Sequence, residues 1–338
     1  MKRSRLVVIA ALSVVGLGLA LALGALVLDP ARAAVGPLPA EGLVLPADTR
    51  FVMGLDVRRF VQSPFYARFA KQGGRPQAFA ELEQKTGFNP ERDVDEVLIA
   101  GRPDGGPQGG VVIVRGRFDR YKLSQAIESE GRKVTTKKHE GNPIYLFNEG
   151  QKGATAVAFL GHDDDLLVMG PQASVEAAVT SHFGGATPLK QNTALVSLLE
   201  RVKPGSTFWM VGDQSLLSQM PTSIPAPGGG GGGGQLQLPA LKALMVTGEL
   251  DPVVSLDVTG DAADAAAAGQ LADIVRGFVA LATLQASQKP ELKGLQNAVS
   301  VTTDQSSVRV SARVPYEILE ALQPKKATAV APAPAPAR

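Results

Sequence analysis

The stretch PADTRFVMGLD at residues 46–56 has a counterpart in PGSTFWMVGD at residues 204–213. Each stretch begins with a proline turn and a threonine, continues as a short apolar run, and ends on an aspartate. Apolar runs of this length that are bounded by turn residues are typical of β-strands. We therefore expect two strands that open equivalent parts of the chain.

Further apolar runs repeat this correspondence at a constant spacing. Landmarks at residues 111, 157 and 166 match landmarks at 253, 299 and 308, each 142 residues later. A constant offset across three elements indicates an internal duplication. The alternative is chance, because apolar runs of four residues are common, and the chain would then form one large α+β domain.

Around these landmarks the apolar periodicity alternates between strand-like and helix-like segments. Strands are expected at 51–56, 96–101, 110–118, 133–139, 143–148, 154–160, 165–170, 208–213, 244–250, 253–260, 298–301 and 308–314, and helices at 63–71, 77–86, 119–130, 172–182, 192–202 and 262–288. The fold class that follows is α+β, with antiparallel sheets, packed helices and a tandem repeat of one module, preceded by an N-terminal membrane helix.

The N-terminus has the pattern of a membrane-targeting segment. Lys2, Arg3 and Arg5 precede an uncharged run from Leu6 to Leu28. Its 23 residues would form a helix about 34 Å long, enough for a hydrocarbon core of about 30 Å. The basic residues favour a cytoplasmic N-terminus with the bulk of the chain outside. We expect a single-pass protein of the bacterial inner membrane, with the membrane as its partner through residues 6–28 and the bulk in the periplasm.

The same region allows a second interpretation. Ala31-Arg32-Ala33 is an A-x-A pattern that could direct cleavage before Ala34 and release the chain into the periplasm. Length favours the retained anchor, because cleaved signal peptides carry an apolar region of only about 7–15 residues. Both alternatives place the folded part outside the cytoplasm.

Composition excludes several classes of function. The chain contains no cysteine, which rules out a disulfide framework, a thiolate nucleophile and a Cys-ligated zinc site. Beyond residues 1–33 it carries 30 basic and 31 acidic residues, so nothing electrostatic favours nucleic acid as a partner. A protein of the cell envelope remains a possible partner.

The chain divides into five parts. They are a targeting segment (1–33), a linker (34–45), a first α+β module (46–187), a second α+β module (188–322) and an Ala/Pro tail (323–338). The second module contains a Gly-rich loop at 222–238, whose seven consecutive glycines are predicted to be disordered because their backbone loses too much entropy in a helix or strand. The loop lacks the flanking pattern of a phosphate-binding loop.

The densest polar cluster is His162-Asp163-Asp164-Asp165. A histidine with carboxylates could ligate a cation, so His162, Asp163 and Asp165 are the candidate metal ligands. The spacing favours a polar hairpin turn instead, because calcium loops place their acidic ligands at alternate positions. We predict no cofactor.

Four other polar residues are candidates for catalysis. Asp56 and Asp213 end the two opening strands and could form an acid and base pair, although each is also placed to cap the helix that follows. His139 and His182 belong to no catalytic motif. We therefore predict no catalytic residue and no enzyme. The alternative is an envelope hydrolase without a recognisable motif, in which Asp56, His139, His162 and Asp213 would converge in one pocket.

The helix expected at 262–288 is apolar nearly all round from Phe278 to Leu284. Such a helix is predicted to be buried on more than one side, between the two modules or against a partner. Trp209, in its apolar strand, is predicted to lie in the core.

Two segments resemble a family of exported bacterial proteins of unknown function whose outer domain opens with Leu-Pro-Ala-Asp-Thr. They are Leu45-Pro46-Ala47-Asp48-Thr49, and Thr86-Gly87-Phe88-Asn89-Pro90 leading into Asp93-Val94-Asp95-Glu96-Val97. The resemblance implies an α+β fold with antiparallel sheets, and it supplies no activity and no site residues. The function we expect is that of a membrane-tethered extracytoplasmic protein with a binding or structural role.

Overall fold

The structure is a computed structural model. It describes residues 45–70, 77–102, 110–129, 134–150, 154–161, 165–184, 188–218, 222–225, 235–287 and 298–322. The predicted membrane helix at 6–28, most of the linker and the Ala/Pro tail lie outside the described residues.

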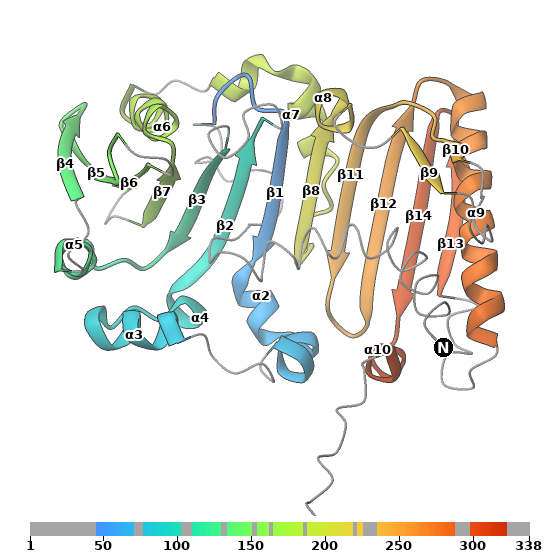
Figure 1. The fold of residues 1–338 in the computed structure, drawn as a ribbon, viewed down its shortest axis with the longest axis horizontal. Coiled ribbons are helices and arrows are strands. Elements are labelled where there is room, and N and C mark those ends of the chain that lie inside the picture. Colours follow the sequence, from blue (N-terminus) through green and yellow to red (C-terminus); the bar gives the residue numbers. More distant parts are fainter. Residues whose placement is uncertain are drawn as a thin grey trace, which may run out of the picture.

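Strands and helices alternate along the described chain (Figure 1). They are β1 (Phe51–Asp56), β2 (Val94–Gly101), β3 (Gly110–Gly116), β4 (Val134–His139), β5 (Asn142–Phe147), β6 (Thr155–Leu160), β7 (Leu166–Gly170), β8 (Phe208–Asp213), β9 (Ser223–Pro225), β10 (Gln235–Gln237), β11 (Leu241–Glu249), β12 (Val254–Ala262), β13 (Val299–Asp304) and β14 (Ser307–Val314).

Helices alternate with these strands. They are α2 (Val57–Gln62), the π-helical turn η2 (Tyr66–Ala70), α3 (Gln77–Thr86), α4 (Pro90–Asp93), α5 (Arg120–Ser129), α6 (Gln172–Gly184), the 3₁₀ turn η6 (Pro188–Gln191), α7 (Thr193–Glu200), α8 (Gln214–Leu217), α9 (Ala265–Ser287) and α10 (Tyr316–Leu322). The predicted α+β class with a large antiparallel sheet and several helices is confirmed.

Twelve strands form one sheet, in the order β13-β14-β12-β11-β8-β1-β2-β3-β7-β6-β5-β4, and every described pair in it is antiparallel. From β1 outward the order runs β2, β3, β7, β6, with β5 and β4 beyond them. From β8 outward it runs β11, β12, β14, β13. In the chain, α5, β4 and β5 lie between β3 and β6, whereas α9 lies between β12 and β13.

The two opening strands, β1 and β8, meet in the middle of this sheet. Met53 is paired with Met210 at the centre of their antiparallel register. At one end of the pair the Asp56 amide donates to the Thr207 carbonyl at 2.8 Å, and at the other the Asp213 amide donates to the Arg50 carbonyl at 3.0 Å. This β1–β8 pairing, called the seam below, therefore has a backbone hydrogen bond beyond each end of the paired residues.

A close approach on the neighbouring strand requires glycine. Gly248 of β11 is paired with Phe208, and a Cβ at this glycine would lie 2.0 Å from the Phe208 ring. Because no other residue lacks that atom, Gly248 leaves room for the far end of the Phe208 ring against β11.

The core lies on both faces of the sheet, since successive side chains of a strand point to opposite faces. Trp209 and Val211 belong to the cluster that α6 and α7 cover, while Phe208 belongs to the cluster on the other face with α2 and α10. Trp209 is 1% exposed, so its predicted place in the core is confirmed.

The last described helix ties the second half of the chain to the first. The Tyr316 ring of α10 stacks on Phe69 of η2 with ring centroids 6.1 Å apart. The Arg68 guanidinium lies 4.9 Å from the centroid of the same ring and pairs with Glu320 at 3.0 Å. The sequence did not predict this helix.

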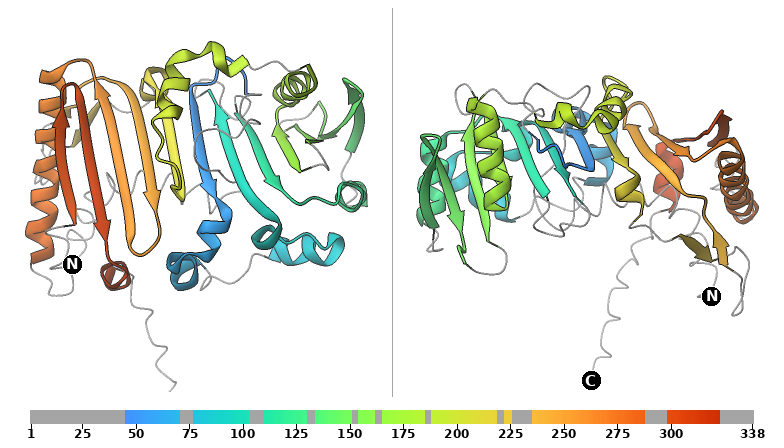
Figure 2. Two further views of the ribbon diagram at one scale, coloured as in Figure 1. Left: turned by 180° about the vertical axis from the view of Figure 1, so that it is seen from behind. Right: turned by 90° about the horizontal axis from the view of Figure 1, so that it is seen from above.

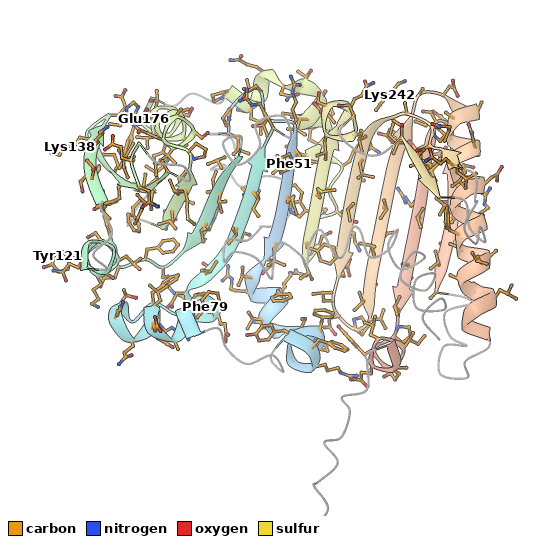
Figure 3. All side chains as sticks on the ribbon, in the orientation of Figure 1. Phe51, Phe79, Tyr121, Lys138, Glu176 and Lys242 are labelled. Carbon is orange, nitrogen blue, oxygen red and sulfur yellow. The ribbon has the colours of Figure 1, made fainter. Side chains whose placement is uncertain are left out.

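Two elements differ from expectation in their position. The helix α9 does not lie between the halves: Figures 1 and 2 place it at the end of the sheet, beside β13 and far from α6. The pairing of β1 with β8 explains the difference. Because the first strand of each half lies in the middle of the sheet, the later strands and helices of each half lie toward the two edges. On α5, Tyr121 is 69% exposed and points away from the sheet (Figure 3), so it does not belong to the apolar face predicted for that helix.

The prediction that residues 222–238 are disordered is wrong at the two ends of this segment. There β9 and β10 pair antiparallel, with Ser223 opposite Gln237 and Pro225 opposite Gln235. The glycine run between these two strands lies outside the described residues.

Candidate functional site

The two aspartates of the opening strands act on the backbone that follows them. The Asp56 carboxylate accepts from the Arg59 amide at 2.8 Å and caps α2. The Asp213 carboxylate accepts from the Ser215 amide at 2.8 Å and caps α8, and it also pairs with Arg50 at 3.2 Å. Both therefore satisfy free amides at a helix start, as the capping alternative predicts.

The candidate residues of the hydrolase alternative do not converge. Asp56 and Asp213 end antiparallel neighbours, so they lie at opposite ends of the two central strands. His139 ends the edge strand β4, and five strands separate β4 from β1. Of the predicted set, His162 lies outside the described residues.

Each of the other histidines has a local partner. The His139 Nε2 lies 2.7 Å from the Thr180 hydroxyl of α6. The His182 Nε2 accepts from the Gly161 amide at 3.3 Å, and its ring meets Phe183 edge-on. These contacts hold α6 against the neighbouring strands.

The predicted cation cluster is only partly visible. Asp165 lies just before β7, where its carbonyl accepts from the Gly116 amide at 3.0 Å, while 162–164 are outside the described residues. Within the described ranges no group of three or more His, Cys, Asp or Glu is placed to hold a metal ion.

Two carboxyl groups whose pKa is lowered serve the fold. A hydrogen bond from Arg92 holds the pKa of Asp93 below its usual value. A hydrogen bond from Arg201 does the same for Asp261, to which Arg201 lies at 2.6 Å. The first pair closes the turn before β2, and the second joins the end of α7 to β12.

Two small pockets open near the ends of the central strands. One, of about 200 Å³, lies between the turn at Asp48, the end of β2 and the start of α6, and the other, of about 190 Å³, lies beside Arg59 and Glu249. Small-molecule sites are usually about 300–1,000 Å³. The Asp48 carboxylate in the wall of the first pocket is already paired with Arg102 at 2.7 Å.

The helix α9 is the longest helix of the described residues and is mostly apolar in composition. Residues Ala265–Leu284 are long and apolar enough to cross a membrane, yet only 11% of the most apolar window is buried. The prediction that this helix is buried on more than one side is therefore wrong. The prediction rested on the nearly continuous apolar composition from Phe278 to Leu284, which is also compatible with a helix that is exposed on one side.

The comparisons with known proteins assign no function. No protein-family model matches the chain, and the search of curated proteins gives no match. Two solved structures, crystal forms I and IV of TP0453, resemble it with a TM-score of 0.44. Their sequences are 11% and 10% identical to this chain, and each match covers 86% of this chain and 96% of the other. At this identity and score the likeness assigns neither fold nor activity.

Proposed function

We propose that this chain is a membrane-tethered protein of the bacterial cell envelope, with its folded part in the periplasm and a binding or structural role. The observation that carries the proposal is the 23-residue uncharged run from Leu6 to Leu28 behind Lys2, Arg3 and Arg5. A run of this length suits a retained anchor, and the basic flank sets its orientation.

A role without catalysis is supported by where the polar side chains lie. Asp56 and Asp213 cap helices at opposite ends of the two central strands, and His139 contacts Thr180 at the far edge of the sheet. General acid–base catalysis needs such groups within hydrogen-bonding reach of one substrate.

The architecture we propose is a tandem repeat of one module over 46–187 and 188–322. It is supported by the shared strand order on the two sides of the seam, and by the pairing of Met53 with its equivalent Met210 on what would be the twofold axis. A single rotation that superposes β1 on β8 should also superpose β3 on β12 and β7 on β14. If one of these pairs needed a different rotation, the repeat would be a coincidence of apolar runs.

The tether is tested by fractionating cells that make the full chain. We expect the protein to stay in the pellet after a carbonate wash and to keep its first residues in peptide mapping. A protease added to spheroplasts should digest the folded part. A soluble mature form beginning at Ala34 would overturn the tether, and protection from the protease would overturn the periplasmic location.

A further inference from the structure

The large sheet does not close on itself, so it ends in two edge strands, β4 and β13 (Figure 1). An edge strand presents backbone N–H and C=O groups that can pair with a strand of another chain. On β4, Lys137 and Lys138 are exposed, and lysines on an edge strand commonly oppose such pairing. The sequence of β13 is VSVTTD, which contains no lysine or proline and is rich in β-branched residues. Of the two edges, β13 is therefore the one that suits an added strand.

The register of β13 with β14 shows which of its backbone groups point outward. The Arg313 amide donates to the Ala298 carbonyl at 2.7 Å, so these two residues form a hydrogen-bonded pair. Hydrogen-bonded and non-hydrogen-bonded pairs alternate along antiparallel strands. Residues 300, 302 and 304 therefore direct their backbone groups toward β14, whereas residues 299, 301 and 303 direct theirs away from it.

These outward groups have no partner in the described part of the chain, where β13 pairs with β14 alone. The helix α9 covers one face of β13, where Val301 packs with Ala268. On the other face Ser300, Thr302 and Asp304 are exposed. The outward groups lie between these two faces, in the plane of the sheet, so an added strand would continue the sheet.

The backbone of β13 is complementary to that of a second copy. Two β13 strands can lie antiparallel with Val301 opposite the partner's Val301. Val299 of each copy then lies opposite Thr303 of the other, so all the outward-facing residues are in hydrogen-bonded pairs. Each such pair exchanges two backbone hydrogen bonds.

The side chains also fit this register. Ser300 lies opposite the partner's Thr302, and hydroxyl groups across a strand pair can hydrogen-bond to each other. Asp304 lies opposite the partner's Ala298, so no two like charges meet. A twofold axis at Val301 generates all these pairs, and twofold symmetry is the commonest symmetry of protein dimers.

We propose that two copies of this chain associate through β13, so that the sheet continues across a twofold axis at Val301. The proposal does not depend on the tether, because the contact involves β13 alone.

The absence of cysteine allows a direct test of the register. S300C and T302C, as full chains with different tags, are made together in one cell, which is then treated with a mild oxidant. In the proposed dimer the two cysteines form a non-hydrogen-bonded pair with Cα atoms about 4.5 Å apart, within the range of a disulfide. We expect the mixed disulfide to be severalfold more abundant than the disulfide of S300C with itself, whose cysteines are offset along the strands.

The control is K138C on the opposite edge strand, which should form no disulfide with itself or with S300C. A mixed disulfide no more abundant than that of S300C alone would overturn the proposed register and the proposal with it. A disulfide between S300C and K138C would show that copies join head to tail, from β13 to β4, and would also overturn the proposal.

A second test measures the mass of the full chain in detergent by light scattering. Thr303→Pro removes an outward N–H group, and proline is tolerated on an edge strand at such a position. The parent chain and Thr303→Val should have twice the chain mass of 35.2 kDa, whereas Thr303→Pro should have the mass of one chain. Fluorescence of the buried Trp209 reports whether each variant is folded.

If the proline variant does not fold, Thr303→Lys takes its place, because Thr303 is exposed and a lysine there should oppose strand pairing. A folded variant of either kind that remains a dimer would place the contact elsewhere in the chain. A parent chain that is monomeric at every concentration tested would also overturn the proposal.

Discussion

Trp209 combines deep burial with an unmet hydrogen bond. It is the largest of the fully buried side chains in the described part of the protein, and its indole Nε1 has no hydrogen-bond partner there. A buried donor without a partner costs about 1–3 kcal/mol. The side chain therefore stabilises the core through its apolar area, against the cost of its own N–H group.

Replacing Trp209 by Phe should change the free energy of unfolding by less than about 1 kcal/mol, because loss of the unmet donor offsets the smaller ring. Trp209→Ala should cost about 3–5 kcal/mol. Urea unfolding followed by circular dichroism measures both. A loss of several kcal/mol in Trp209→Phe would mean that the indole N–H has a partner.

Asp93 is a structural carboxylate whose charge matters. It accepts from the Asn89 amide at 2.8 Å and from Arg92 through two nitrogens at 2.9 and 2.7 Å. The hydrogen bond from Arg92 is the main cause that lowers its pKa in the folded protein. A carboxyl whose folded pKa is depressed stabilises the fold above its unfolded pKa of about 4, and that stabilisation is lost as the pH falls through the folded value.

Asp93→Asn should therefore be less stable than the parent chain at pH 7, and the gap should narrow as the pH falls below about 4. The urea midpoint of both proteins across that range measures it. Glu91→Gln removes one negative charge from the same turn and serves as the control. A gap that stays constant with pH would assign the effect to packing and not to charge.

At the scale of single elements, one aspartate caps the start of each of the helices α2 and α8. Asp56→Ala should destabilise the protein by about 1 kcal/mol, because it frees the Arg59 amide at the start of α2. Asp56→Asn keeps a capping oxygen and should cost much less. Thermal unfolding compares the two variants. Equal losses would show that the charge of Asp56 and not its cap holds the helix.

Most strands could be predicted from the sequence because each is a short apolar run between turn residues. The run at 154–160 is observed as β6 and that at 165–170 as β7, each with one residue fewer. The position of α9 could not be predicted, because its apolarity is compatible with a core, a partner or a surface. Only the seam between β1 and β8, a contact between residues about 157 apart, decides that α9 lies at the outer end of the sheet.

The candidate site shows the same limit. That Asp56 and Asp213 end corresponding strands could be read from the chain, and so could their capping role. Their separation depends on the antiparallel pairing of those strands, which no local pattern specifies. The similarity of residues 46–56 to residues 204–213 thus predicted the conformation of each stretch, but not the distance between Asp56 and Asp213.

At the scale of the whole molecule, one hydrophobic cluster crosses the predicted module boundary at 187/188. It contains Ile144 and Val168 from the first half together with Leu195 and Trp209 from the second. The sheet is continuous through the seam, and α10 packs on η2. Modules that share a cluster and a sheet should lose their structure together.

We therefore expect the folded part to unfold in a single transition, even if it arose from two copies of one module. Ile144→Ala on β5 should destabilise the protein by about 2–5 kcal/mol, as for other buried Ile→Ala changes. Five strands separate β5 from β8, yet the fluorescence of Trp209, the single tryptophan of the chain, should shift by the full amount in urea unfolding. Lys138→Ala, on the exposed face of β4, is the control and should leave the midpoint unchanged. If Ile144→Ala shifted the circular dichroism transition while Trp209 unfolded at its original urea concentration, the two halves would be independent domains that only share a sheet edge.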